Sequence, residues 1–286
     1  MTIAAADARN ADQIAHWNGA GGRNWVDRQE AQEASLAPVS AAMIERAGVR
    51  PGEHVIDVGC GTGPTTIEFG ALVGPSGLVL GIDVSEPMLE RARTRLQSGS
   101  PVSFVQADAT AYDFPRASFD LVASRFGVMF FAEPAKTFAN LRTALRAGGR
   151  LAFACWRKPD ENPWLTVPLR AACEHAPPLP SVGPEEPGMF SLAREDRIRR
   201  ILGDAGFTAI RAEPVNFEFD IGRGRGLDEA AAAALTIGPA GRALEGQPPE
   251  IRRAALGSIR RALAPHQRGS AIPLAAAVWI VTAINP

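Results

Sequence analysis

A glycine-rich segment carries the clearest chemistry in this sequence of 286 residues. It reads Asp57-Val58-Gly59-Cys60-Gly61-Thr62-Gly63 and lies directly after a short apolar run and directly before a helical pattern. Glycines let the backbone turn sharply and let a ligand approach with no Cβ in the way. The helix behind them presents free N–H groups. The segment therefore predicts a ligand-binding loop rather than a bare strand-to-helix turn.

Two carboxylates follow the next two predicted strands. Asp83 ends the apolar run 78–82, and the pair Asp108 and Ala109 follows the run 102–105. An acid at the first position can accept both hydroxyls of a ribose, and the second is placed to receive an adenine amino group. Open α/β sheets bind ligands at the carboxyl ends of their strands, where such residues meet. The spacing thus favours a nucleotide-like ligand.

Two other ligand loops fit this segment poorly. A dinucleotide loop has its third glycine three residues after the second, where this chain has Pro64. A phosphate loop needs a lysine after its last glycine, and no lysine lies nearby. A nicotinamide oxidoreductase is therefore disfavoured.

The elements that must position these residues alternate between short apolar strands and amphipathic helices. Strand–helix alternation predicts βαβ units with right-handed crossovers. We predict an α/β fold with a doubly wound, mostly parallel, seven-stranded Rossmann-like sheet. The predicted strands are 55–58, 78–82, 102–105, 119–123, 151–155, 215–221 and 274–282. The predicted helices are 30–47 with Pro38 making its middle doubtful, 86–97 with Ser85 as N-cap, one from Pro134 that Gly148 ends, 194–205, 228–235 and 249–263.

These residues together resemble the ordered motifs of class I S-adenosylmethionine-dependent methyltransferases. The likeness is close over residues 40–156 and is nearest to the group related to the ubiquinone and menaquinone biosynthesis methyltransferases. The stretch 119–124 contributes to it, and 145–151 is similar to that group's Leu-x-Pro-Gly-Gly-x-Leu, with Ala147 replacing proline. The resemblance implies a methyltransferase with S-adenosyl-L-methionine as cofactor. A non-catalytic S-adenosylmethionine-binding protein of the same fold is the alternative.

The resemblance also assigns roles to individual positions. Gly59 and Gly61 would approach the methionine part of the cofactor, and Asp57 would orient its amino group. Asp83 would hold the ribose hydroxyls. The other expected cofactor residues are Cys60 as a small apolar residue of the loop, Val84 and Met88 against the adenine, Asp108 and Ala109 at its polar edge, and Ser124 beside the sulfonium.

The segment 124–131 lies where this fold places the reacting methyl group. The Asn/Asp-Pro-Pro-aromatic motif of base and glutamine methyltransferases is absent, which counts against those substrates. His175 is the candidate base, although methyl transfer requires none because positioning can supply much of the acceleration. We expect a small neutral or aromatic acceptor in an apolar pocket. The pocket is predicted to contain Trp17, Trp25, Phe126, Phe130, Trp156 and Trp164.

One domain over residues 1–286 is the simplest organisation. Residues 1–30 are expected to form an N-terminal flap and 40–156 the cofactor-binding core. The segments 157–192 and 222–270 read as insertions that cover the substrate. The first of them is rich in proline, which predicts stiff but irregular chain.

The balance of charge excludes some partners. Thirty basic residues against 31 acidic ones give a net charge of −1, so neither nucleic acid nor a membrane surface is an expected partner. The longest apolar run, 273–283, is shorter than the roughly 18–20 residues of a membrane span. The three cysteines show no metal-type spacing, so we expect no metal and a cytoplasmic location.

Overall fold

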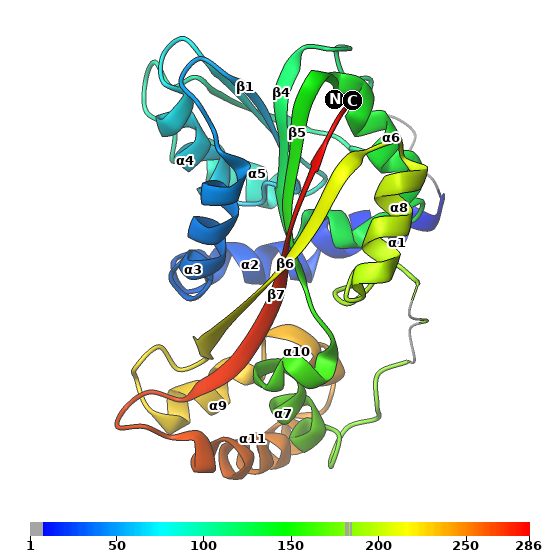
Figure 1. The fold of residues 1–286 in the computed structure, drawn as a ribbon. Coiled ribbons are helices and arrows are strands. Elements are labelled where there is room, and N and C mark those ends of the chain that lie inside the picture. Colours follow the sequence, from blue (N-terminus) through cyan, green and yellow to red (C-terminus); the bar gives the residue numbers. More distant parts are fainter. Residues whose placement is uncertain (1–7, 181–182, 184) are drawn as a thin grey trace.

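A seven-stranded sheet forms the centre of the computed structural model, which describes residues 8–180, 183 and 185–286 (Figure 1). The strand order is β3-β2-β1-β4-β5-β7-β6. Five neighbouring strands are parallel, and β7 pairs antiparallel with both β5 and β6. The predicted fold class is confirmed. The strands are β1 (His54–Val58), β2 (Leu78–Asp83), β3 (Val102–Gln106), β4 (Phe119–Arg125), β5 (Leu145–Trp156), β6 (Thr208–Asp220) and β7 (Pro273–Ile284).

Helices cover both faces of this sheet, as its parallel strands require. In Figure 1, α3, α4 and α5 lie on one side, and α6 and α8 lie on the other. The bounds in the core are α3 (Gln29–Ala47), α4 (Pro64–Val73), α5 (Glu86–Arg93), α6 (Pro134–Ala144) and α8 (Glu195–Asp204). Central strand residues such as Val55, Leu121 and Phe153 are fully buried between these layers.

Two further groups of helices lie at the carboxyl edge of the sheet. The N-terminal pair is α1 (Ala8–Asn18) and α2 (Ala20–Asp27), of which α2 packs against α5. A helical unit consists of α7 (Pro163–Ala172), α9 (Leu227–Ala234), α10 (Gly238–Ala243) and α11 (Pro249–Leu263). Figure 1 shows β6 and β7 extending from the core to this unit. In the part of the chain that the structure describes, no helix is long and apolar enough to cross a membrane.

Most predicted elements are present, with differences at their ends. Helix α3 runs unbroken through Pro38, because this residue lies on the exposed side, where water can satisfy the carbonyl that a proline leaves unpaired. The α6 helix ends at Ala144 rather than near Gly148, since Leu145 is extended and pairs with Phe119 of β4. Helix α5 ends at Arg93, which is earlier than predicted. The short α10 was not predicted.

Candidate active site

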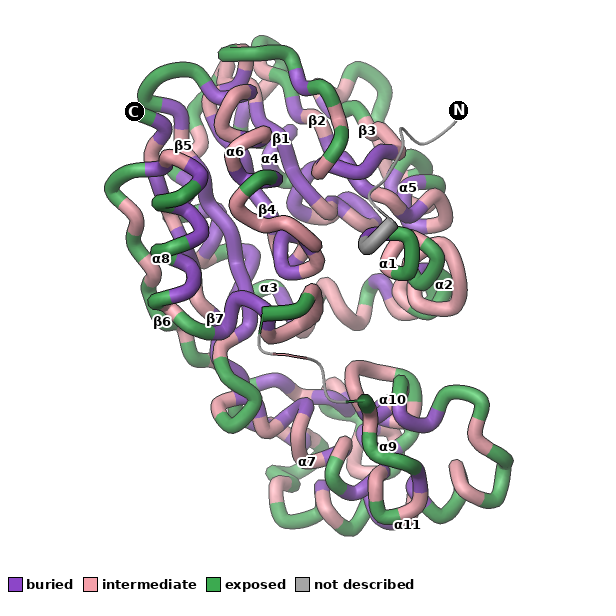
Figure 2. The backbone as a smooth tube through the Cα atoms, turned by 90° about the vertical axis from the view of Figure 1, so that its right-hand side faces the viewer, coloured by how far each residue is buried: buried purple, intermediate pink, exposed green. Residues whose placement is uncertain are grey.

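A cavity of about 1120 Å³ opens at the carboxyl edge of the sheet. Its walls come from the ends of β1, β2 and β4, from α1 and α2, and from the helical unit. Figure 2 shows α1 and α2 on the core side and α10 of the helical unit facing them from below. The cavity joins two chemically different regions. We call them the glycine-loop end (Val58–Thr62, Asp83 and Asp108) and the aromatic end (Phe126, Phe130, Trp156 and Trp164).

The glycine loop is held in its turn by backbone geometry that favours glycine. Gly59, Gly61 and Gly63 have φ angles of +67°, +55° and +80°, a left-handed region that costs other residues strain. A Cβ on Gly59 would lie 2.6 Å from the Cα of Gly127, so no side chain fits there. A Cβ on Gly61 would have room, but this glycine donates its N–H to Asp83 Oδ2 at 2.7 Å. Gly59 and Gly61 both line the cavity.

Asp83 joins the loop to the second strand. Its Oδ1 accepts the N–H of Ser85 at 2.8 Å, while Oδ2 accepts that of Gly61. A carboxylate has about four acceptor positions, so these two bonds leave capacity for a ligand. Burial raises the pKa of Asp83, and the N–H groups of Ser85 and Gly61 oppose that rise. The side chain lines the cavity and is positioned to accept hydroxyl groups.

Asp108 also lines the cavity, but a residue that the sequence did not single out already contacts it. Asn10 of α1 donates its Nδ2 to Asp108 Oδ2 at 2.6 Å, and Thr110 donates its N–H to Oδ1 at 2.9 Å. Both Asn10 and Asp108 are buried. The polar edge predicted from Asp108 therefore includes the N-terminal helix as well.

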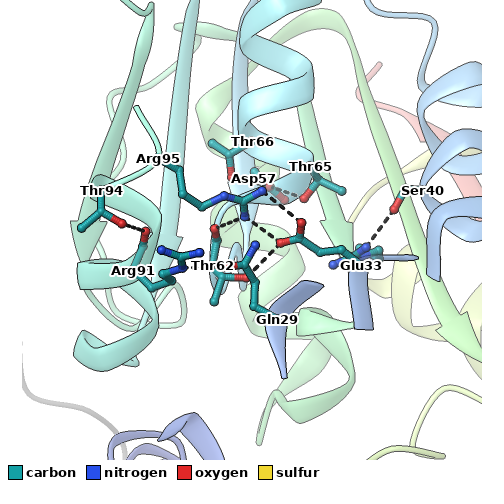
Figure 3. Close-up of polar contacts among 11 residues, drawn as sticks. Gln29, Glu33, Ser40, Asp57, Thr62, Thr65, Thr66, Arg91, Thr94 and Arg95 are labelled. Carbon is teal, nitrogen blue, oxygen red and sulfur yellow. Dashed lines mark hydrogen bonds and ion pairs between the residues drawn. The ribbon is translucent and has the colours of Figure 1, made fainter. Parts of the chain in front are cut away.

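Asp57 lies behind the cavity rather than in its wall. Its Oδ2 accepts the hydroxyls of Thr65 and Thr66, both at 2.7 Å (Figure 3). Its Oδ1 is buried and has no hydrogen-bond partner among the described residues. Burial raises the pKa of Asp57 to about 6, against the lowering effect of the two threonine hydroxyls and of Arg125. Asp57 therefore holds the first turn of α4. The sequence predicted instead that it contacts the amino group of the cofactor directly.

Ser124 likewise supports the cavity from behind. Its hydroxyl donates to the carbonyl of Val58 at 2.7 Å and accepts the N–H of Gly127 at 3.1 Å. It is fully buried and does not line the cavity, contrary to the predicted place beside the sulfonium. The other predicted cofactor residues, Cys60, Val84, Met88 and Ala109, all line the cavity. Burial raises the pKa of the Cys60 thiol, which remains a neutral apolar group.

All six aromatic residues of the predicted pocket line this same cavity. Phe126 stacks on Trp156, with ring centroids 4.4 Å apart and planes 6° from parallel. Trp156 in turn contacts Trp164 at 5.1 Å. Trp17 meets Phe130 edge to face at 5.6 Å and Trp25 at 6.2 Å, which brings the N-terminal helices to the aromatic end.

Phe126 adopts an unusual backbone conformation for a bulky residue. Its φ angle is +70°, the left-handed region that otherwise holds the glycines of the loop. Such strain persists only where surrounding contacts impose it, and it gathers at functional sites. Here the N–H of Phe126 donates to the carbonyl of Ala154 at 3.0 Å, which holds the turn against β5.

The N-terminal helices are fastened to the glycine-loop end by polar contacts. Asn18 donates its Nδ2 to the carbonyl of Val84 and accepts the N–H of Glu86, so it caps α5 from another part of the chain. Ser85 occupies the predicted N-cap position, yet its hydroxyl donates to the carbonyl of Trp17 at 2.6 Å instead of capping the helix. These contacts are absent from local sequence patterns because they join segments more than 60 residues apart.

A second set of contacts secures the loop through α3. Glu33 accepts two hydrogen bonds from Arg95, at 2.6 and 3.0 Å (Figure 3). The same guanidinium donates to the carbonyl of Thr62 at 2.7 Å. Arg95 thus ties the glycine loop to both α3 and the end of α5.

The candidate base named from the sequence does not lie at the cavity. His175 lies outside the cavity wall, and its Nε2 is 2.8 Å from the hydroxyl of Ser258. Among the described residues His16 is the histidine that lines the cavity. Burial and then the charge of Arg242 lower its pKa, so the imidazole is neutral at neutral pH. Its place in a glycine-rich segment beside Trp17 was the available signal.

The cavity also contains more charge than the sequence suggested. Arg125, the last residue of β4, was not singled out, although ligands of such sheets bind at the carboxyl ends of the strands. Arg242 and Arg252 line the side formed by the helical unit, with Glu245 beside them.

The glycine-loop end fits the cofactor predicted from the sequence. It offers close backbone approach at Gly61, spare acceptor capacity on Asp83, and apolar contact from Val84 and Met88. Ligand pockets commonly have volumes of about 300–1,000 Å³. At about 1120 Å³ this cavity has room for the cofactor and a second molecule together.

Comparison with known proteins places this geometry in context. A family model described as a methyltransferase domain matches residues 55–149. The ubiquinone/menaquinone biosynthesis C-methyltransferase UbiE of Hahella chejuensis is 40% identical over 123 residues, which cover 42% of this chain and 49% of that protein. UbiE of Cronobacter sakazakii is 32% identical over 178 residues, covering 57% and 70%. The chain spans about half the length of the first of these curated relatives.

Solved structures show the same fold. A Haemonchus contortus phosphoethanolamine N-methyltransferase 2 in complex with S-adenosyl-L-methionine superposes with a TM-score of 0.58 at 17% identity, covering 99% of this chain and 60% of that one. The YcgJ protein of Bacillus subtilis gives a TM-score of 0.56 at 17% identity, covering 86% and 97%.

Proposed function

Because the chain belongs to the class I S-adenosylmethionine-dependent methyltransferases, we propose that it methylates a small neutral or aromatic molecule held at the aromatic end of the cavity. The observation that supports this proposal is that the glycine-loop end and the aromatic end belong to one continuous cavity. Residues of the glycine loop and stacked aromatic rings line one cavity, so a donor and an acceptor can lie side by side.

At the glycine-loop end the proposed cofactor contacts follow from the geometry. Gly59 and Gly61 let the methionine part approach the backbone, and Asp83 accepts the ribose hydroxyls with its spare lone pairs. Val84 and Met88 pack on the adenine, and the Asp108–Asn10 pair lies at its polar edge. When bound, the cofactor supplies an electrophilic methyl group on a sulfonium.

At the aromatic end the residues act by binding and orientation. Phe126 and Trp156 stack on each other and contribute apolar surface to the cavity wall, which suits an apolar ring. Holding the acceptor atom in line with the donor supplies much of the rate enhancement. The relatives are named as C-methyltransferases of ubiquinone and menaquinone biosynthesis, so a quinol-type ring is the first acceptor to test.

We further propose that residues 1–30 act as a flap and that segments 157–192 and 222–270 cover the acceptor. Within the described part of the flap, Asn10, Trp17 and Asn18 contact the glycine-loop end and Phe130. From the two covering segments, Trp164 and Arg242 line the cavity. Excluding water in this way strengthens every electrostatic contact inside the site.

The experiment is an acceptor panel matched for shape and differing in charge. The protein is incubated with methyl-labelled S-adenosylmethionine and with a hydroquinone, its phenol ether and the corresponding benzoate, and products are weighed by mass spectrometry. We expect label on the neutral rings, and much less with Trp156→Leu than with the exposed control Leu72→Ala. Label on the benzoate alone contradicts the neutral acceptor. Cofactor binding with no transfer to any ring of the panel contradicts the proposal and favours a non-catalytic binding protein.

A further inference from the structure

Arg125 is a cavity residue to which none of the roles above is assigned. It ends β4, and continuing the β1–β4 register from the pair Asp57 and Ala123 places it level with Gly59. It therefore lies beside the part of the glycine loop that should meet the methionine end of the cofactor. The loop residues Val58–Thr62 and Thr65 line the same cavity as Arg125.

The guanidinium of Arg125 retains free hydrogen-bonding capacity. It has five N–H donors. Its Nη1 donates to the hydroxyl of Ser40 on α3 at 2.8 Å. Within residues 8–180, 183 and 185–286, no carboxylate forms an ion pair with it, and none of its nitrogens is both buried and unpartnered. Because Arg125 lines the cavity, its remaining donors are open to a ligand.

Three acids act on Arg125 electrostatically, Asp57, Glu33 and Glu68, and none of them forms an ion pair with it. Glu33 is bound to Arg95, and Asp57 accepts the hydroxyls of Thr65 and Thr66. Burial lowers the pKa of Arg125, and the charges of Asp57 and Glu33 oppose that effect without pairing with the guanidinium. A partly buried guanidinium that donates to one hydroxyl but pairs with no carboxylate of the chain is suited to bind a ligand carboxylate in bidentate fashion.

We propose that Arg125 binds the carboxylate of the methionine part of the cofactor, an inference that rests on the proposed function. The contact makes the site select the intact amino-acid group, because a ligand that lacks the carboxylate leaves the buried guanidinium unpaired. Ser40 is the positioning residue that orients the guanidinium from α3.

The test is a calorimetric comparison of two ligands that differ in this one group. S-adenosylhomocysteine and its decarboxylated analogue are titrated into the wild-type protein, Arg125→Met and Arg125→Lys. We expect Arg125→Met to weaken binding of S-adenosylhomocysteine by about 10- to 100-fold, the range for hydrogen bonds to charged groups. Binding of the analogue should change by no more than about twofold. Arg125→Lys should fall between wild type and Arg125→Met.

The matched control is Arg253→Met, which removes an exposed arginine of α11 that does not line the cavity and should leave both affinities unchanged. Equal losses for both ligands in Arg125→Met, or no loss for either, overturn the inference. If Arg125→Met does not fold, two measurements still test the inference: the ratio of the wild-type affinities for the two ligands, and the affinities of Arg125→Lys for them. The inference is then overturned if wild type binds S-adenosylhomocysteine less than about twofold more tightly than the decarboxylated analogue.

Different binding results refute the role of Arg125 and the proposed function. A wild-type protein that binds S-adenosylhomocysteine without preferring it to the analogue refutes the role of Arg125 alone. An Arg125→Met variant that binds both ligands normally but loses turnover of a carboxylated acceptor also overturns the inference, since Arg125 would then contact the acceptor. Absence of any binding by the wild type refutes both.

Discussion

The two ends of the cavity are built by different physical means. At the glycine-loop end, left-handed backbone positions are glycines, and directional hydrogen bonds join the main chain to Asp83 and Asp108. At the aromatic end the left-handed position is Phe126, and the contacts are between rings. The glycine-loop end recognises its ligand through hydrogen bonds to individual atoms, whereas the aromatic end provides an apolar surface.

This contrast explains why the cofactor can be predicted and the acceptor cannot. Hydrogen-bonding groups must stand at fixed positions, so they leave motifs in the sequence. Apolar walls tolerate many arrangements of rings as long as volume is kept. Family resemblance is accordingly concentrated in residues 55–149, before the helical unit begins.

The largest expected effect is on the pH dependence of the free energy of unfolding. It comes from Asp57, which lies behind the glycine-loop end. Its pKa is raised from 3.8 to about 6, so the folded state binds the proton more tightly than the unfolded state. Its contribution is fully present below about pH 4 and is lost as pH rises through about 6. The loss is on the order of 3 kcal/mol, at 1.36 kcal/mol for each pKa unit.

The measurement compares wild type with Asp57→Asn by chemical denaturation at about pH 4 and about pH 8. Asparagine does not titrate and can still accept the hydroxyls of Thr65 and Thr66. The variant should therefore gain stability relative to wild type at the higher pH. Parallel stability curves would show that Asp57 keeps an ordinary pKa.

The next effect sharpens the cofactor side of the comparison. Asp83→Ala should weaken binding of S-adenosylhomocysteine by about 1.5–3 kcal/mol, because hydrogen bonds to a charged acceptor are lost. The fold should persist, since Asp83 ends a strand. Calorimetry with Asp113→Ala, an exposed acid, serves as control. Unchanged affinity in Asp83→Ala would mean that the ribose binds elsewhere.

The strain at Phe126 gives a smaller effect at the aromatic end. Both Phe126→Ala and Phe126→Gly remove the ring, but only glycine relieves the positive φ angle. The glycine variant should be more stable than the alanine variant by about 1–2 kcal/mol, the reverse of the usual order. Thermal unfolding measures the difference. An alanine variant that is equally stable or more stable refutes backbone strain at this position.

The smallest effect tests the attachment of the N-terminal helices. Asn18→Ala removes the cap of α5 and the contact with Val84, which should cost about 0.5–1 kcal/mol. Limited proteolysis should cut the variant faster near residue 20, whereas Asn24→Ala on α2 should behave as wild type. Identical cleavage rates for the two variants would indicate that Asn18 does not hold these helices.

The core could be predicted from the sequence because each buried strand contains a short run of apolar residues. The run 55–58 and the glycines after it specify a strand, a turn and a helix start within a short stretch. The glycine-rich segment 19–22 contains the start of α2, although glycine disfavours helix. Gly22 lies within α2, and a Cβ there would be only 2.0 Å from the carbonyl oxygen of Trp17, so no larger residue fits this position.

Contacts between distant segments account for what the sequence did not reveal. Nothing local marks Asn10 as the partner of Asp108, or Ser40 as the partner of Arg125. Both pairs exist because the fold brings α1 to the carboxyl edge of the sheet and packs α3 against the face beside it. The aromatic residues were found because large rings are few in this chain, not because their spacing showed a pocket.

A crystal structure with S-adenosylhomocysteine tests the central claim most directly. We expect the ribose hydroxyls on Asp83 and the cofactor sulfur facing Phe126 and Trp156 within the shared cavity. Apolar space beside that sulfur should remain open for a planar acceptor. A ligand bound away from Asp83, or a sulfur separated from the aromatic end by protein, would contradict the division of the cavity into a cofactor end and an acceptor end.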